Sequence, residues 1–243
     1  MRHLLATILL GPVLLWQGKA VRRQVPLLPE PPGERHGRRG GGPLLRLLVV
    51  GDSAAAGVGA SHQDEALLGR LVQDLEPHVT VEWTLCARTG ATTVSTLERL
   101  ARLEGGPFDV AVVSLGVNDI TAGLGLGAWL ERQATLRRVL REDHGVSGLV
   151  VSGLPPVQRF PALPQPLRWY LGARAREFDR ALRRAVADEP DVAFVGLDVT
   201  EDPAAMASDG FHPGPPVYRE WGRRAAEAAL ALRARDRGGV RDD

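Results

Sequence analysis

The stretch LRLLVVGDSAAAGVG at residues 45–59 joins an apolar, strand-like run to a glycine-rich turn that carries one hydroxyl group, that of Ser53. An apolar run of this length is typical of a strand buried on both faces in the centre of a parallel sheet. Ligands bind outside the carboxyl ends of such strands, where a reactive side chain in this turn would be well placed. A tight turn capped by Asp52 or Ser53 explains the same residues. The stretch therefore predicts a central strand and leaves the role of Ser53 open.

Composition limits the classes of protein to which the chain can belong. Its 243 residues are 44% hydrophobic, which is enough for one domain with a sizeable core. The formal net charge is +1, so nothing in the charge balance indicates nucleic acid as a partner. Cys86 is the single cysteine in the sequence, which excludes an intrachain disulfide and a cysteine-based zinc cluster.

Residues 1–20 form an N-terminal hydrophobic segment with a short basic head and an apolar run at 4–16. The run is shorter than the roughly 20 residues that span a bilayer, and a small-x-small pattern follows it, as in a secretory signal peptide. Lys19, Arg22 and Arg23 instead favour an uncleaved membrane anchor with the domain on the cytoplasmic side. The segment predicts a membrane-associated or exported protein and leaves the side of the membrane open.

Three further regions follow from composition. Residues 21–43 are rich in Pro, Gly and Arg without an apolar period, which predicts an exposed linker. The folded domain is expected to span residues 44–233. Residues 234–243 are mostly charged or glycine and predict a flexible tail.

Within this domain, predicted strands alternate with predicted helices. Such alternation favours parallel βαβ units with right-handed crossovers and helices on both faces of the sheet. The expected fold is a flavodoxin-like, three-layer α/β/α sandwich with a central parallel sheet of about five strands. After the first strand, the strands are expected at residues 79–87, 108–115, 148–152 and 192–196, and the helices at about 65–76, 94–103, 128–142, 167–187 and 215–233.

Two connections are longer than usual for this kind of fold. The loop at 153–166 contains five prolines around Phe160 and Leu163. Long loops at the carboxyl edge of a sheet are usually functional, so this loop predicts a pocket wall with Phe160 and Leu163 as substrate-binding residues, the alternative being an exposed spacer. The second loop, 198–216, carries Asp209 and His212 just before the last helix.

Polar or glycine residues occupy three predicted strand ends and the late loop. Ser53, Gly90 and Asn118 follow the first three strands, while Asp209 and His212 are three positions apart in the loop. A serine hydroxyl needs a base within hydrogen-bond reach to act as a nucleophile, and a histidine can supply it. A carboxylate can hold that imidazole in the required tautomer. The backbone amides of Ser53 and Gly90 and the side-chain amide of Asn118 could donate hydrogen bonds to an oxyanion.

Four short blocks together resemble those of the SGNH hydrolase superfamily, the GDSL-type esterases and lipases. They are Gly51-Asp52-Ser53, Gly90, Gly116-Val117-Asn118-Asp119 and Asp209-Gly210-Phe211-His212, within a resemblance that covers residues 45 to about 233. The resemblance implies a serine esterase or lipase, lysophospholipase-like, without metal or cofactor, that acts on small-molecule or lipid esters or thioesters. It also implies a nucleophile and oxyanion donor at Ser53, further donors at Gly90 and Asn118, an orienting carboxylate at Asp209 and a base at His212.

Departures from related patterns refine this resemblance. Ala54 stands where the GDSL name has leucine, a position that varies in the superfamily. The Gly-x-Ser-x-Gly elbow of α/β-hydrolases is absent around Ser53. Asp52 and Asp119 are expected to brace their turns by hydrogen bonds to nearby amides rather than to transfer protons.

Two alternatives stay open. A metal-dependent phosphoesterase also begins with a Gly-Asp turn and has a later Asn, but a two-metal site needs more histidines and carboxylates at strand ends than this domain offers. A membrane-tethered binding module would keep the fold without the chemistry. The complete set of Ser53, Gly90, Asn118, Asp209 and His212 argues against that second alternative.

Overall fold

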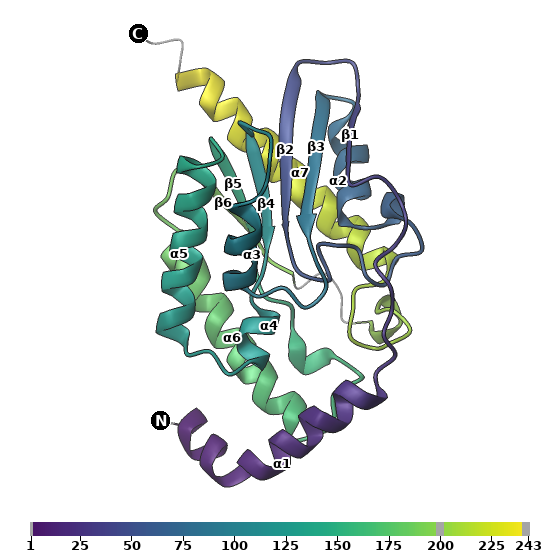
Figure 1. The fold of residues 1–243 in the computed structure, drawn as a ribbon, viewed down its shortest axis with the longest axis vertical. Helices are drawn as coiled ribbons and strands as arrows, with labels where there is room; N and C mark the ends of the chain where they lie inside the picture. The colour runs from purple at the N-terminus through teal and green to yellow at the C-terminus, as the bar shows by residue number, and fades with distance from the viewer. Residues whose placement is uncertain (1, 198–201, 240–243) are drawn as a thin grey trace.

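One sheet runs through the part of the chain that the computed structural model describes, residues 2–197 and 202–239 (Figure 1). Its six strands lie in the order β1-β3-β2-β4-β5-β6. All neighbouring strands from β3 to β6 pair in parallel, and β1 pairs antiparallel with β3 at the edge. The strands are β1 His36–Arg39, β2 Leu44–Gly51, β3 Thr80–Ala87, β4 Val110–Ser114, β5 Gly148–Ser152 and β6 Val192–Val195.

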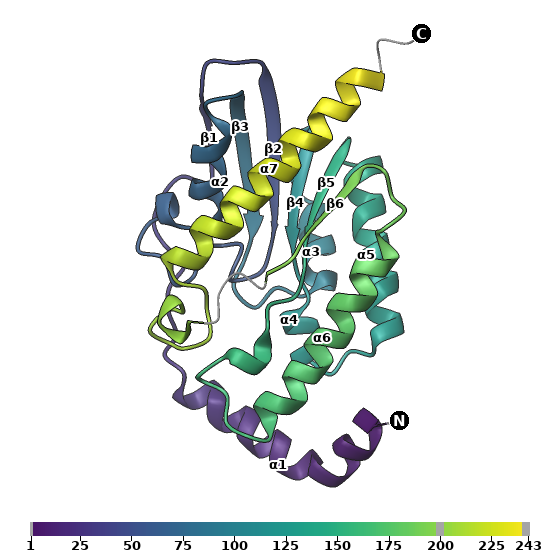
Figure 2. The same cartoon turned by 180° about the vertical axis from the view of Figure 1, so that it is seen from behind.

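Helices cover both faces of the sheet. Helices α2 and α7 pack on one face, and α3, α5 and α6 pack on the other, as the two opposite views show (Figures 1 and 2). Short 3₁₀ turns occur at Gln63–Glu65, Val157–Arg159 and Pro203–Ala205. The helices are α1 Arg2–Gln24, α2 Leu67–Leu75, α3 Thr93–Leu100, α4 Val117–Thr121, α5 Leu126–Glu142, α6 Leu167–Ala185 and α7 Pro215–Gly239.

Strand β2 lies at the centre of this arrangement. Leu48 and Val50 belong to the core on the side of α3, α5 and α6, and Leu45, Leu47 and Val49 belong to the core on the side of α2 and α7. All five side chains are completely buried. The apolar run therefore forms a strand buried on both faces, because each face of the sheet has its own helical layer.

The predicted architecture is confirmed. The five parallel strands have the spatial order 2-1-3-4-5 in their own chain sequence, which is the flavodoxin-like order. The sheet has one strand more than the five expected because β1 adds an antiparallel edge. Helix α7 continues to Gly239 rather than ending near residue 233, and residues 240–243 of the predicted tail lie outside the described residues.

The prediction of an exposed linker at 21–43 is wrong for two parts of that segment. Helix α1 extends to Gln24, and His36–Arg39 forms β1. Main-chain hydrogen bonds to β3 hold this strand, and Gly37 lies directly against the ring of Trp83, where a Cβ atom would come within 2.3 Å of Cζ2. Strand β1 therefore depends on its pairing with β3 and on the close packing of Gly37 against Trp83, and not on an apolar pattern in its own sequence.

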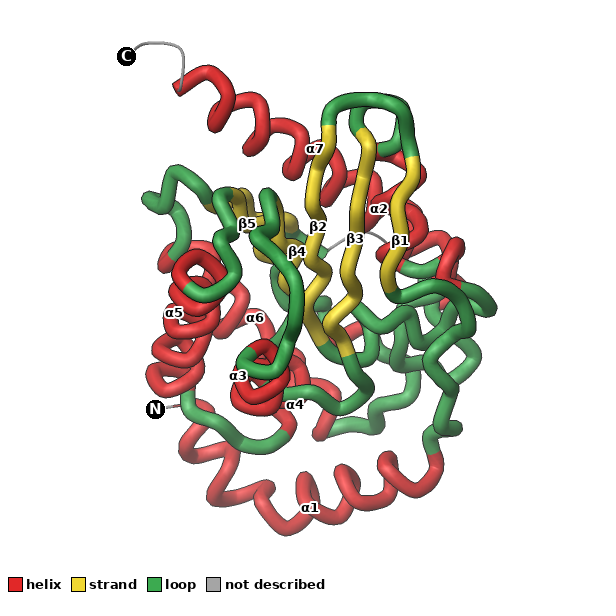
Figure 3. The backbone as a smooth tube through the Cα atoms, turned by 45° about the horizontal axis from the view of Figure 1, so that its top comes forward, coloured by secondary structure: helices red, strands yellow, loops and turns green. Residues whose placement is uncertain are grey.

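Helix α1 lies at the end of the molecule towards which the parallel strands point (Figures 1 and 3). Leu14 is buried, and Gln17 donates to the Gln165 carbonyl at 2.6 Å and accepts from the Leu167 amide at 3.0 Å. These contacts join α1 to the start of α6, while Trp16 is 70% exposed. Among the described residues, no helix combines the length and apolarity that crossing a bilayer requires.

Candidate active site

Ser53 lies in the turn that directly follows β2. The Asp52 carboxylate accepts a hydrogen bond from the Ala54 amide at 3.1 Å, and the Ser53 carbonyl accepts one from the Val58 amide at 3.0 Å. A Cβ atom on Gly51 would lie 2.4 Å from the Ala55 Cβ and 2.5 Å from the Ser114 carbonyl. Glycine is therefore required where the strand enters the turn, and the turn leaves Ser53 partly exposed.

Tyr218 of α7 stabilises the turn that carries Ser53. Its hydroxyl donates to the carbonyls of Ala54, at 3.0 Å, and Val58, at 2.7 Å. Burial raises the pKa of this phenol well above its ordinary value, so it stays a donor. Tyr218 is not among the residues predicted from the sequence, although a tyrosine on the apolar side of a terminal helix needs a buried partner for its hydroxyl.

His212 and Asp209 meet Ser53 from the loop before α7. The His212 Nε2 atom lies 2.9 Å from the Ser53 Oγ, and the His212 Nδ1 atom lies 2.5 Å from the Asp209 Oδ2. Gly210 adopts a φ of +63°, which lets the loop turn between the two side chains. The structure therefore brings the three predicted residues into one continuous hydrogen-bonded chain.

The environment of Asp209 keeps its carboxyl group ionised. Burial raises its pKa, but hydrogen bonds from the His212 ring and from the backbone amides of His212 and Phe211 outweigh burial, and the pKa falls below its ordinary value. The two amide hydrogen bonds, from Phe211 and His212, measure 2.9 and 3.0 Å. The Phe211 ring also packs edge-on against both the His212 imidazole and the Phe160 ring. These contacts orient the imidazole towards Ser53.

Gly90 and Asn118 follow the ends of β3 and β4. The Asn118 side-chain amide donates to the Ala91 carbonyl at 2.9 Å, which ties the two turns together. Gly90 has a φ of +78°, a backbone conformation that favours glycine. A Cβ atom at this position would have no atom within 4 Å, so a lack of room for a side chain is not the reason for glycine here. Asn118 lines the same cavity as Ser53 and His212, whereas Gly90 lines a separate groove beside it.

Asp52 and Asp119 are both buried and both hydrogen-bonded. Burial raises the pKa of Asp52 to about 6 and also raises that of Asp119. Asp52 holds its own turn, but Asp119 reaches the start of α3, where it accepts from the Thr93 amide at 3.1 Å and the Thr93 hydroxyl at 2.9 Å. Gln133 donates to the same hydroxyl at 2.9 Å. Asp119 thus braces the start of α3.

An apolar cavity of about 90 Å³ adjoins Ser53 and His212. Phe160 lines this cavity, as the sequence predicted for the proline-rich loop, but Leu163 does not. Leu163 packs into the core on the α6 side because the loop folds its side chain inwards, and it is 3% exposed. Further apolar lining residues, which were not predicted from the sequence, are Leu115, Val117, Leu154, Met206, Val217 and Trp221.

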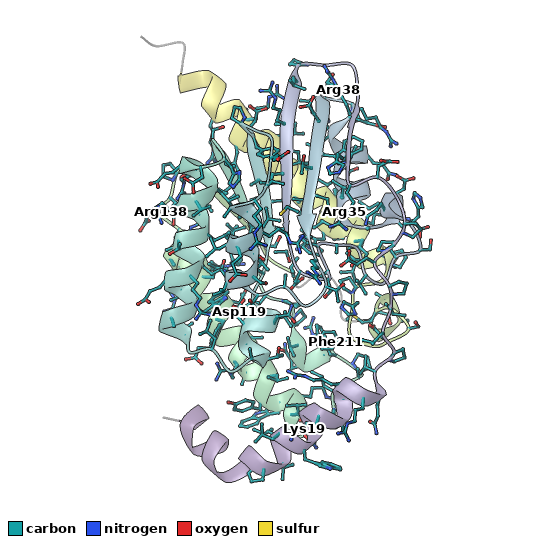
Figure 4. All side chains as sticks on the ribbon, viewed as in Figure 1. Lys19, Arg35, Arg38, Asp119, Arg138 and Phe211 are labelled. Carbon is teal, nitrogen blue, oxygen red and sulfur yellow. The ribbon has the colours of Figure 1, made fainter. Side chains whose placement is uncertain are left out.

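All these groups lie at the edge of the sheet where the parallel strands end. Figure 4 shows Asp119 and Phe211 in this region, between the sheet and α1. Within residues 2–197 and 202–239, no three His, Cys, Asp or Glu side chains are grouped as a metal site.

Comparisons with known proteins agree with this architecture. The sequence profile of the GDSL-like lipase/acylhydrolase family matches residues 49–220. The GDSL-like esterase Rv1075c of Mycobacterium tuberculosis is 30% identical over 229 residues, which cover 85% of this chain and 72% of that protein.

Solved structures show the same fold. A psychrotrophic esterase, EstA from Pseudoalteromonas sp., determined in a form inhibited by monoethylphosphonate, superposes with a TM-score of 0.59 at 18% identity, covering 78% of this chain and 98% of its own. The protein TesA superposes with a TM-score of 0.55 at 23% identity, covering 77% of this chain and 97% of its own.

The fold and these relatives define a hydrolase that acts on ester bonds. More particularly, the chain belongs to the GDSL-like lipase/acylhydrolase family of the SGNH hydrolase superfamily.

Proposed function

We propose that this protein hydrolyses carboxylic esters or thioesters through an acyl-enzyme formed on Ser53. The observation that carries the proposal is the hydrogen-bonded chain from the Ser53 Oγ to the His212 Nε2 and from the His212 Nδ1 to the Asp209 carboxylate. Such a chain supplies a base for the serine hydroxyl and a carboxylate for the imidazolium that forms.

The reaction follows from these contacts in two stages. In the first, His212 takes the proton of the Ser53 hydroxyl as the Oγ atom attacks the ester carbonyl carbon. His212 then gives this proton to the leaving alcohol or thiol as the acyl-enzyme forms. In the second stage, His212 takes a proton from water, the resulting hydroxide attacks the acyl carbon, and Ser53 recovers its proton from His212. Asp209 remains ionised throughout and holds the imidazole in place.

The negative charge on the carbonyl oxygen needs hydrogen-bond donors in both stages. We assign this role to the backbone amides of Ser53 and Gly90 and to the side-chain amide of Asn118. The contact between Asn118 and the Ala91 carbonyl supports the assignment because it fixes the amide group beside the turn of Gly90. Asp119 holds the start of α3, just after this turn, through the amide and hydroxyl of Thr93. These residues would be positioned before the substrate arrives, as preorganised stabilisation requires.

The apolar cavity beside Ser53 is the proposed site of the acyl group. Leu115, Leu154 and Phe160 would contact an acyl chain whose carbonyl carbon lies at Ser53. Burying each methylene group of such a chain contributes about 0.8 kcal/mol, so the cavity favours an apolar acyl group over a polar one. Leu163 has no part in this proposal because it lies in the core.

Replacing Ser53 by Ala tests the proposal directly. We expect hydrolysis of p-nitrophenyl butyrate to fall by about 10⁴-fold or more, as is usual when the nucleophile of a serine hydrolase is removed. The matched control is Ser61→Ala, because Ser61 is exposed and its hydroxyl donates a hydrogen bond to the Glu65 carboxylate. Circular dichroism establishes that both variants keep the fold. Turnover retained in Ser53→Ala would contradict the assignment.

A further inference from the structure

A second hollow, which we call the arginine groove, opens beside the proposed oxyanion donors. It encloses about 600 Å³, and its lining includes Arg35, Arg88, Arg99 and Arg102. Gly90 and Ala91 line the same groove. It therefore reaches the turn whose amide is proposed to bind the carbonyl oxygen, and it shares no lining residue with the apolar cavity.

The groove lies between the edge strands of the sheet and helix α3. Strands β1 and β3 form the end of the sheet beyond α3 and α5, as two views agree (Figures 1 and 3). Arg88 follows β3, Arg99 belongs to the last turn of α3, and Arg102 lies in the turn directly after that helix. Arg35 comes from the segment before β1, next to β3 (Figure 4). Four arginines from three segments thus surround one hollow.

The positive charge of the groove is only partly neutralised. Arg35 forms an ion pair with Glu30 at 3.0 Å and donates to the Ala87 carbonyl. Arg88, Arg99 and Arg102 form no side-chain hydrogen bond or ion pair with any residue in the described ranges. Glu98 is the one carboxylate in the lining.

Two arginines of α5, in contrast, have carboxylate partners. Arg138 pairs with Glu142 at 2.8 Å, and Arg141 pairs with Glu189 and Asp191 at 2.5 and 2.6 Å. The charges around the groove also act on Cys86, a buried residue in its wall. Burial raises the pKa of the Cys86 thiol, and the charges of Arg99 and Arg35 oppose that rise. Three unpaired guanidinium groups facing one hollow form a site for an anion, because arginine binds phosphate and carboxylate through paired hydrogen bonds.

We propose that the arginine groove binds an anionic group, a phosphate or a carboxylate, on the leaving alcohol or thiol of the ester substrate. This inference rests on the proposed function, because it places the substrate carbonyl between Ser53, Gly90 and Asn118. From that point the apolar cavity receives the acyl chain, and the groove lined by Gly90 receives the other half of the ester. The preferred substrate is therefore an acyl ester of an anionic alcohol.

Two matched substrates test this preference: 1-hexanoylglycerol and 1-hexanoylglycerol 3-phosphate. We expect kcat/KM for the phosphorylated ester to exceed that for the neutral ester by about tenfold or more in 50 mM NaCl, which corresponds to about 1.4 kcal/mol. The preference should shrink as NaCl rises to 0.5 M, because salt screens exposed charges. Equal kcat/KM values for the two esters in wild-type protein would overturn the inference while leaving the esterase proposal intact.

The triple variant Arg88→Gln/Arg99→Gln/Arg102→Gln should bring the ratio of the two kcat/KM values close to one. The matched control is Arg176→Gln/Arg180→Gln/Arg184→Gln, which removes three charges from an exposed side of α6 and should keep the wild-type ratio. A ratio that is unchanged in the groove variant, or that falls equally in both, would refute the assignment.

A binding measurement separates failure of this inference from failure of the proposed chemistry. Isothermal titration with 1-O-hexylglycerol 3-phosphate, an ether that cannot be hydrolysed, needs no turnover. We expect it to bind at least tenfold more tightly than 1-O-hexylglycerol, with the difference lost in the groove variant. No difference would overturn the inference even if neither ester is hydrolysed. Inorganic phosphate is titrated in the same way. If phosphate binds to the wild-type protein and not to the groove variant, while the two ethers bind with equal affinity, the groove binds a separate anion and the substrate assignment is wrong.

Discussion

Burial of Asp52 should make the protein less stable as the pH rises through the acid range. Burial raises the pKa of this carboxyl from 3.8 to about 6, although the Ala54 amide and the charge of His212 oppose the rise. The folded protein therefore holds the Asp52 proton more tightly than the unfolded chain does. Its free energy of unfolding consequently falls between about pH 4 and pH 6. At about 1.36 kcal/mol per pKa unit, the loss is about 3 kcal/mol once the group is ionised.

Asp52→Asn removes this titration and keeps an oxygen that can accept from the Ala54 amide. We expect the free energy of unfolding of the variant, relative to wild type, to rise by about 1.5 kcal/mol between pH 5 and pH 8. Urea denaturation followed by circular dichroism at several pH values measures this change, and any constant effect of the amide group cancels. Asp188→Asn, at an exposed position, is the control and should show no such rise. A relative free energy for Asp52→Asn that does not change with pH would refute the reasoning.

Two further predictions concern groups around Ser53. Asn118→Ala should lower kcat by about a hundredfold to a thousandfold in steady-state assays with little change in KM, because one oxyanion donor is lost; an unchanged kcat would remove Asn118 from the site. Tyr218→Phe should lower the free energy of unfolding in urea by about 1–2 kcal/mol and reduce kcat, because the Ala54 and Val58 carbonyls lose their shared donor. Wild-type stability in that variant would show that the hydroxyl does not hold the turn.

The sequence was sufficient to predict the layers of the fold. Residues 47–50 are apolar at every position, and this pattern is typical of a strand in a sheet whose two faces are both covered by helices. Strand β1 could not be predicted in the same way. His36–Arg39 has no apolar alternation, and its place depends on an open edge of β3 and on the fit of Gly37 against Trp83. Contacts of this kind join segments that are distant in the chain, so the residues of β1 alone carry no pattern from which the strand could be predicted.

The candidate site was predictable to a similar extent. Ser53, Asp209 and His212 stand at positions that parallel topology brings together, and the structure places them within hydrogen-bond distance. Their catalytic roles stay predictions. Leu163 shows the limit of the sequence, because an apolar residue in a loop can face either a cavity or the core, and here it faces the core. Tyr218 was missed because its partners are backbone carbonyls, which the sequence does not distinguish.

The central claim, that Ser53 is the nucleophile, is tested most directly by covalent labelling with a fluorophosphonate. Intact-protein mass spectrometry of the wild-type protein should show one adduct, and peptide mapping should place it on Ser53. Ser53→Ala should gain no adduct under the same conditions. An adduct on a different residue, or no adduct on a folded wild-type protein that hydrolyses esters, would contradict the proposed mechanism.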